Sequence, residues 1–284
     1  MNKEYLEYYK KEWAEYFVFN GHSSNEYGIA LTRIDEPIPA LSYDMEHIPG
    51  RPGEMITGSE SYSNVDITYR CTILENAYEN LRSLAGLLMT PTTYVRLEDS
   101  YHPDIFRMAI CKTTITPEML KLRTGANFEI TFSCLPQQWL KIGELENRKS
   151  IPAKYTTDII DEDIEVFNPT DFDAKPLFRF NTSEQYAPSS DRWFTLTING
   201  VDVKFRTVTN DFQYDYVLDC ENGETYGINK STGNTFNINK FIKPIKKIPF
   251  LQKGKNIIHI YYESPSTSST PSFEFYWKGR WWTL

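Results

Sequence analysis

The segment VDITYRCTILENAYENLRSLAGLLMT, residues 65–90, decides the fold of the first half of the chain. Its first nine residues alternate, and the apolar side chains that share one side are Val65, Ile67, Tyr69, Cys71 and Ile73. Such alternation is typical of a β-strand with one buried face. From Leu74 onward the apolar residues recur at helical spacing, and Pro91 predicts that the helix ends before it. The segment therefore predicts a strand followed by one amphipathic helix.

Further strands are predicted on both sides of this segment. The candidates are FVFNG (17–21), GIALTRI (28–34), TTYVRLE (92–98), FRMAICKTTIT (106–116) and NFEITFSCLP (127–136). The dipeptide Asn20-Gly21 predicts a tight turn after the first of them. Residues 17–140 are thus predicted to form a domain of strands with one helix, an α+β pattern.

The chain before this domain has a different pattern. Tyrosines and Trp13 recur at helical spacing between residues 4 and 16, which predicts a helical extension over residues 1–16. A helix this short is marginal in water unless it lies on another surface. Its role is left open.

The second half of the chain is predicted to be entirely β. Periodicity weakens over residues 141–165, which contain the acidic run 158–165, and this favours a linker. Residues 166–284 contain short strands separated by turns at Asn199-Gly200 and Asn222-Gly223. That spacing indicates a β-sandwich or jelly roll, so the whole chain is expected to be mainly β.

Composition excludes several classes of function. The 284 residues carry a net charge of −8 and no long cluster of Lys or Arg, which disfavours sequence-specific nucleic-acid binding. No stretch approaches the roughly 20 apolar residues that span a bilayer, and the N-terminus lacks the apolar core of a secretory signal. The four cysteines form no CxxC pair, so no disulfide framework is implied.

No catalytic, metal or cofactor site is predicted. The four histidines lack the spacing of a zinc motif, and Asp99, His102 and Asp104 are better explained by a turn at Pro103 than by a cation site. Neither a GxSxG nucleophile motif nor a phosphate-binding glycine loop occurs. These observations indicate a structural or binding protein and not an enzyme.

Two groups of residues remain as candidates for binding. Arg51 lies between Gly50 and Gly53 in a loop with two prolines, which is either an anion-binding loop or a turn before the strand at Val65. Trp277, Trp281 and Trp282 either offer aromatic faces to a glycan or belong to a core or subunit contact. The residues alone leave both alternatives open.

The order of several motifs resembles the distal tail proteins of siphophages. In the first half these are FVFNGHSSNEYGI (17–29), IPALSYDMEHIPGRPGE (38–54) and FEITFSCLP (128–136). In the second half they are FNPTDFDAKPLFRF (167–180), FTLTINGVD (194–202), VLDCENGETY (217–226) and LQKGKNIIHI (251–260). Each motif is weak alone, but together they span residues 17 to about 280 in the order of the family.

The resemblance implies a structural role in a virion. It implies that residues 17–140 form a tail-tube-like β-sandwich domain that assembles into a hexameric ring, single or double, with Arg51, Gly50, Gly53, Asn20 and Gly21 as ring-interface or structural residues. Residues 166–284 are then a galectin-like sandwich. The expected partners are the tail tube above and the baseplate or fibre protein below, DNA passes through the lumen, and assembly takes place in the host cytoplasm. The alternative is a carbohydrate-binding adhesion module that contacts the host surface.

Overall fold

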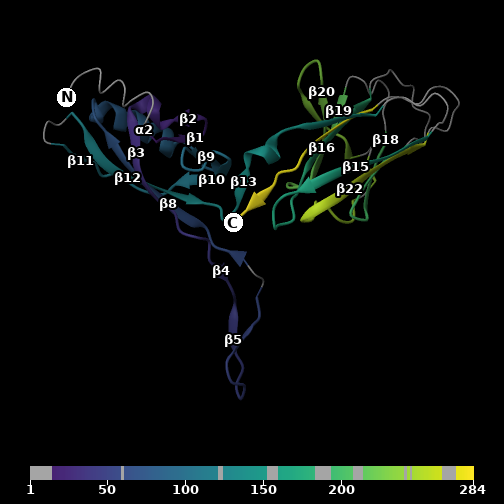
Figure 1. The fold of residues 1–284 in the computed structure, drawn as a ribbon, viewed down its shortest axis with the longest axis horizontal. Coiled ribbons are helices and arrows are strands. Elements are labelled where there is room, and N and C mark those ends of the chain that lie inside the picture. The colour runs from purple at the N-terminus through teal and green to yellow at the C-terminus, as the bar shows by residue number, and fades with distance from the viewer. Residues whose placement is uncertain are drawn as a thin grey trace. The chain divides into compact units, whose positions relative to one another are not determined.

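The computed structural model describes residues 15–58, 61–120, 124–151, 159–182, 193–206, 214–239, 242–243, 245–263 and 273–284. The chain divides into two compact units, residues 1–139 with Leu284 and residues 140–283. The part of the chain that is described contains one α-helix and otherwise strands and short turns (Figure 1). The predicted mainly-β fold with one helix is confirmed.

The first unit is built on one curled antiparallel sheet. The strands of its sheet follow the order β2-β1-β9-β10-β12-β8-β3, with β11 beside β12 and β13 beside β10. The bounds are β1 (Phe17–Phe19), β2 (His22–Ser23), η1 (Ser24–Tyr27), β3 (Ile29–Asp35), β8 (Val65–Ile73), α2 (Ala77–Met89), β9 (Val95–Asp99), β10 (Ile105–Cys111), β11 (Glu118–Met119), β12 (Ala126–Cys134) and β13 (Gln138–Leu140).

The alternating residues of β8 form the centre of this unit, as predicted. β8 and β12 pair over nine consecutive positions, and the buried residues of both strands point to the same side. Phe17, Phe19, Tyr69 and Phe132 form one aromatic cluster there, with ring centroids 4.9–5.8 Å apart. Helix α2 covers this side with the buried residues Ala77, Leu84 and Leu88.

The predicted N-terminal helix lies almost entirely outside the described residues, since these begin at Glu15. Glu15 itself forms an isolated β-bridge with Leu31, and the amide of Leu31 donates to its carbonyl at 2.8 Å. The last residues of the segment 4–16 are therefore extended and not helical, because Glu15 continues the edge of the sheet beside β3.

The second unit is a sandwich of two antiparallel sheets. One sheet has the order β14-β23-β16-β19-β20-β21 and the other β15-β22-β17-β18. The bounds are η2 (Lys141–Glu144), β14 (Asn147–Ile151), β15 (Ile159–Asn168), β16 (Leu177–Thr182), β17 (Trp193–Ile198), β18 (Val201–Arg206), β19 (Tyr214–Asp219), β20 (Glu224–Asn229), β21 (Thr235–Asn237), β22 (Gly254–Glu263), β23 (Phe273–Lys278) and β24 (Trp282–Thr283). One hydrophobic cluster joins the two sheets.

The prediction of a linker over residues 141–165 is wrong for the described residues of that range, 141–151 and 159–165. Residues 147–151 form β14 and pair with β23, while the acidic run continues into β15 and pairs with β22 over ten positions. Within that run Ile160 and Ile164 are buried, and the carboxylates between them face solvent. Buried and exposed residues alternate along β15 as in other strands, but the many charged side chains made this alternation hard to recognise in the sequence.

Candidate functional site

A long hairpin leaves the sheet of the first unit between β3 and β8 (Figure 1). We call residues 40–58 and 61–63 the hairpin arm. Its two sides pair as β4 (Leu41–Ser42) with β7 (Ser61–Tyr62) and β5 (Met45–His47) with β6 (Glu54–Ile56). The amide of Ser63 donates to the carbonyl of Ala40, and the amide of Thr57 donates to the carbonyl of Asp44. The two sides are therefore bonded to each other from base to tip.

The tip of the arm is the predicted proline-glycine turn. The amide of Arg51 donates to the carbonyl of Ile48 at 3.1 Å, and Gly50 has a φ of +86°. Proline followed by a residue with positive φ is the sequence of a type II turn, which only glycine enters without strain. The turn reverses the chain inside the arm, between β5 and β6. A turn before the strand at Val65 is one alternative that the sequence offers, and the structure places this turn inside the arm and not directly before β8.

Arg51 is exposed at this tip. Its Nη1 lies 3.5 Å from the Sδ of Met55, and none of the ion pairs among the described residues includes its guanidinium. Within one chain the cation is therefore not neutralised by a carboxylate in this part of the structure. An anion from another molecule would have access to it.

The arm also exposes apolar side chains. Met45 and Ile56 are direct cross-strand neighbours, and each is 56% exposed. Ile38, at the base of the arm, is 90% exposed, and Tyr43 and Met55 are exposed as well. A two-stranded ribbon is marginally stable in water by itself, and a group of exposed apolar residues marks an interaction surface.

The base of the arm is fixed by a buried charge cluster. Glu36, directly after β3, receives a hydrogen bond from Arg107, whose side chain is 4% exposed on β10. Nη1 of Arg107 also lies 3.7 Å from Asp99, which accepts a hydrogen bond of 2.6 Å from the hydroxyl of Tyr69. Burial, together with the charge of Asp99, raises the pKa of Tyr69 well above its usual value, so this hydroxyl stays protonated.

His102 completes this cluster. Its backbone amide donates to Asp99 at 2.8 Å, which is the turn predicted around Pro103, and its Nε2 lies 3.4 Å from Glu36. The described residues contain no group of three or more His, Cys, Asp or Glu that could hold a metal ion. The cluster is therefore a structural anchor that joins the start of the arm to the sheet.

Asn20 and Gly21 form the predicted tight turn between β1 and β2. Their φ values are +51° and +84°, and Phe19 pairs directly with His22 across them. The amide of Asn20 donates to the carbonyl of Arg96 on β9. Both residues have a local structural role, and their place in a ring interface stays a prediction.

The three tryptophans are engaged in contacts within the second unit. Trp281 is 7% exposed, and its ring lies over Gly279. Trp277 stacks on Phe275 of the sandwich core. Trp282 stacks on Phe172 at 4.3 Å and donates its Nε1 to a backbone carbonyl. These contacts account for the indole rings without a glycan.

The cysteines are reduced and mostly inaccessible. All four are free, and Cys71, Cys134 and Cys220 are buried. Burial raises the pKa of Cys134 to about 12, although the nearby charge of Arg107 opposes this. A thiol with such a pKa is a poor nucleophile, because the thiolate is the reactive form.

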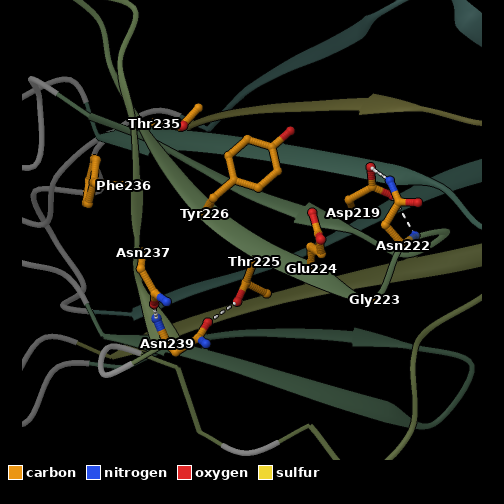
Figure 2. A pocket seen from close by; sticks show the side chains of 10 residues that line it. All are labelled: Asp219, Asn222, Gly223, Glu224, Thr225, Tyr226, Thr235, Phe236, Asn237 and Asn239. Atoms are coloured by element: carbon orange, nitrogen blue, oxygen red, sulfur yellow. Dashed lines mark hydrogen bonds between the residues drawn. The ribbon is translucent and has the colours of Figure 1, made fainter.

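A polar groove lies beside the edge of the second unit's larger sheet. It has a volume of about 720 Å³ and is formed by the β19–β20 turn, β20 and β21 (Figure 2). Figure 2 shows that Tyr226, Thr225 and Glu224 of β20 and the asparagines after Phe236 surround it. Sequence reading missed this groove, because its walls come from segments whose proximity depends on the pairing of β20 with β21.

Comparisons with known proteins show which families and structures this chain resembles. Residues 22–134 match a family model described as the phage tail protein RIFT-related domain. The crystal structure of the Dit (gp 19.1) protein of phage SPP1 has a TM-score of 0.64 at 14% identity, over 95% of this chain and 99% of that chain. Two structures of the phage p2 baseplate in its activated conformation, with calcium and with strontium, each cover 93% of this chain and 98% of theirs at 8% identity, with TM-scores of 0.48 and 0.47.

The search of curated proteins returned no match. The matched domain and the fold define a phage tail protein. The family model over residues 22–134 and the Dit-like fold support the resemblance to the distal tail proteins of siphophages that the motifs indicated. The matched phage tail domain indicates a component of the virion tail.

Proposed function

We propose that this protein forms a hexameric ring at the tip of a long non-contractile tail. The ring joins the tail tube to the baseplate or fibre protein, and DNA leaves through its lumen. In this role the protein catalyses no reaction and holds no cofactor. It needs surfaces for copies of itself and for two different neighbours. The family model over residues 22–134 and the Dit-like fold support the proposal.

The observation that carries the proposal is the hairpin arm. A single chain leaves Met45, Ile56 and Ile38 in water, at a cost of roughly 25 cal/mol per Å² of apolar surface that burial would recover. An arm fixed at its base and extended at its tip is suited to reach a neighbouring copy. When each copy offers its arm to a different surface on the next, the contact is heterologous and closes into a ring under rotation.

Charge supports the same assignment. Arg51 at the tip of the arm provides a planar cation for a carboxylate of the next copy, and the chain as a whole is acidic, at −8. An acidic lumen would repel the phosphate backbone and let DNA slide through. No helix among the described residues is long and apolar enough to cross a membrane.

The experiment is to measure the mass and shape of the assembly. Mass photometry and negative-stain microscopy of the purified protein, alone and with its tail-tube and baseplate partners, are expected to show six-fold rings. The double variant Met45→Glu with Ile56→Glu should abolish rings while the melting temperature stays unchanged. Ile257→Glu on β22 is the matched control, since this isoleucine is also about half exposed. Normal rings from the arm variant would refute the role of the arm, and a persistent monomer of the wild type in every mixture would refute the ring.

A second candidate function is favoured by the polar groove on β20 and β21. We propose it as the basis of carbohydrate binding at the host surface, in place of the three tryptophans. Trp281 is buried, and Trp277 and Trp282 are partly buried and stack on Phe275 and Phe172, whereas the groove is open and lined by hydrogen-bonding groups. Binding of the whole protein to glycans on an array tests this function.

A further inference from the structure

The groove on β20 and β21 presents hydrogen-bond donors that are held in place. The backbone amide of Asn239 donates to Oδ1 of Asn237 at 2.8 Å, and the hydroxyl of Thr225 donates to Oδ1 of Asn239 at 2.9 Å (Figure 2). The side-chain oxygens of Asn237 and Asn239 thus each accept a hydrogen bond from within the protein. Among the described residues neither Nδ2 group has a partner, so both donors are available to a ligand.

Tyr226 and Glu224 add complementary groups to the same groove. Tyr226 is the direct cross-strand neighbour of Asn237, so the two side chains emerge side by side on one face. Its hydroxyl has no hydrogen-bond partner in the described part of the chain, and burial with the nearby charge of Asp219 raises its pKa, so it remains a donor. The carboxylate of Glu224 is exposed and forms no ion pair with a described residue, which leaves it as an acceptor.

The walls of the groove are held by contacts within the second unit. Asp219 binds both Nη atoms of Arg280, at 2.6 and 3.1 Å, and accepts hydrogen bonds from the backbone amides of Glu221 and Asn222. Its oxygens are therefore engaged in holding the β19–β20 turn. On the other side the ring of Phe236 lies across Gly227 and against Tyr214 at 5.0 Å. A site already held in its binding geometry loses less entropy when a ligand enters.

The chemistry of the lining selects a class of ligand. No Lys, Arg or His lines the groove, and its charged groups are the carboxylates of Asp219 and Glu224. Phosphorylated or otherwise anionic ligands are therefore disfavoured. Neutral donors, one acceptor and an aromatic ring match a molecule with several hydroxyl groups. A volume of about 720 Å³ also lies within the range of roughly 300–1,000 Å³ that is typical of ligand pockets.

We infer that this groove binds a neutral sugar unit of a surface glycan. The amides of Asn237 and Asn239 donate to the sugar hydroxyls, Glu224 accepts from them, and Tyr226 contributes its hydroxyl and its ring. The inference rests on the second candidate function, to which it gives a location and a ligand class. It is independent of whether the protein forms rings.

Two isosteric variants test the inference. Asn237→Asp and Asn239→Asp keep the Oδ1 acceptor that the fold uses and replace only the free donor. Asn229→Asp is the matched control, because Oδ1 of Asn229 accepts the amides of Ser231 and Thr232 outside the groove. The control adds the same charge at the end of the neighbouring strand β20 without altering the lining.

The measurement has two stages. Fluorescently labelled protein is applied to an array of neutral hexose and N-acetylhexosamine oligosaccharides, with sialylated and phosphorylated glycans for comparison. Titration calorimetry with the best-bound glycan then compares the variants. We expect a neutral glycan to bind, and each groove variant to lose about tenfold or more in affinity, since a lost donor leaves a ligand hydroxyl unpaired. The control should bind as the wild type does.

The failures are distinguishable. An array without any bound glycan overturns both the carbohydrate function and this site. Binding that persists unchanged in both groove variants overturns the site alone and leaves the function to another surface. Preference for the anionic glycans overturns the ligand class. If a variant melts at a lower temperature than the control, its affinity is measured well below that temperature, and Glu224→Gln serves as the additional groove variant.

Discussion

The buried guanidinium of Arg107 on β10 meets the carboxylate of Glu36, which lies 71 residues earlier at the base of the hairpin arm. Burial lowers the pKa of Arg107, yet an arginine remains charged at neutral pH, so it needs its carboxylates. The same guanidinium lies 3.7 Å from Asp99, whose side chain is 1% exposed. One cation thus joins the start of the arm to the central sheet.

Replacing this cation should destabilise the first unit strongly. Arg107→Ala leaves the carboxylate of Asp99 buried without the guanidinium that lies 3.7 Å away, and breaking a buried pair costs about 3–5 kcal/mol. Equilibrium urea denaturation followed by tryptophan fluorescence and circular dichroism measures the loss. The control is Arg70→Ala on β8, whose ion pairs with Asp35 and Glu129 are exposed and worth about 0–1 kcal/mol. Equal losses from the two variants would show that the buried pair has no special role.

Arg51 should matter for assembly and not for the stability of the single chain. Its side chain is exposed, and its contact within the described residues is with the sulfur of Met55. We expect Arg51→Ala to reduce the fraction of rings seen by negative-stain microscopy while the melting temperature stays within error. Arg51→Lys keeps the charge but lacks the planar guanidinium that can bind a carboxylate with two hydrogen bonds. It should therefore form more rings than Arg51→Ala but fewer than the wild type. Normal rings from Arg51→Ala would remove this residue from the interface.

The second unit should lose stability in acid through Asp219. Burial of this carboxylate raises its pKa, but the bonds from Arg280 and from the amides of Asn222 and Glu221 outweigh burial, and the net pKa is lowered. A depressed pKa contributes stability that is present above the unfolded value, about 3.9 for Asp, and is lost as pH falls through the folded value. Asp219→Asn should therefore flatten the fall in melting temperature below about pH 4. The exposed Asp161→Asn is the control for the loss of one carboxylate, and an unchanged slope in Asp219→Asn would contradict the assignment.

Sequence reasoning succeeded where one periodicity extends over many residues. β8, β12 and α2 each present a buried face through nine or more positions, so local pattern and tertiary burial agree. The turns at Asn20-Gly21 and Asn199-Gly200 were predictable for a different reason. Both residues of each turn have positive φ, which asparagine and glycine tolerate best.

The hairpin arm was missed because its strands have two or three residues and both faces are exposed. Without a buried face there is no alternation to detect. One signal was available: DMEH and GEMI flank the IPGRP turn nearly symmetrically. The contact between Glu36 and Arg107 and the groove beside β21 had no local signal, because they depend on the register between segments that are distant in sequence or joined by an irregular turn.

Gly227 should control the shape of the proposed sugar site through Phe236. The two residues are directly opposite on β20 and β21, and a Cβ on Gly227 would come within 2.2 Å of the Phe236 ring. Gly227→Ala must therefore displace that ring from the strand, and overpacking of this kind costs about 1–3 kcal/mol. In the background Phe236→Ala the space is empty, so the same substitution should cost much less. Thermal denaturation of the four proteins in this cycle measures the coupling between the two positions. Additive losses would show that Phe236 does not lie over Gly227 in solution, whereas strong coupling with weakened glycan binding in Gly227→Ala would connect the packing of β21 to the groove.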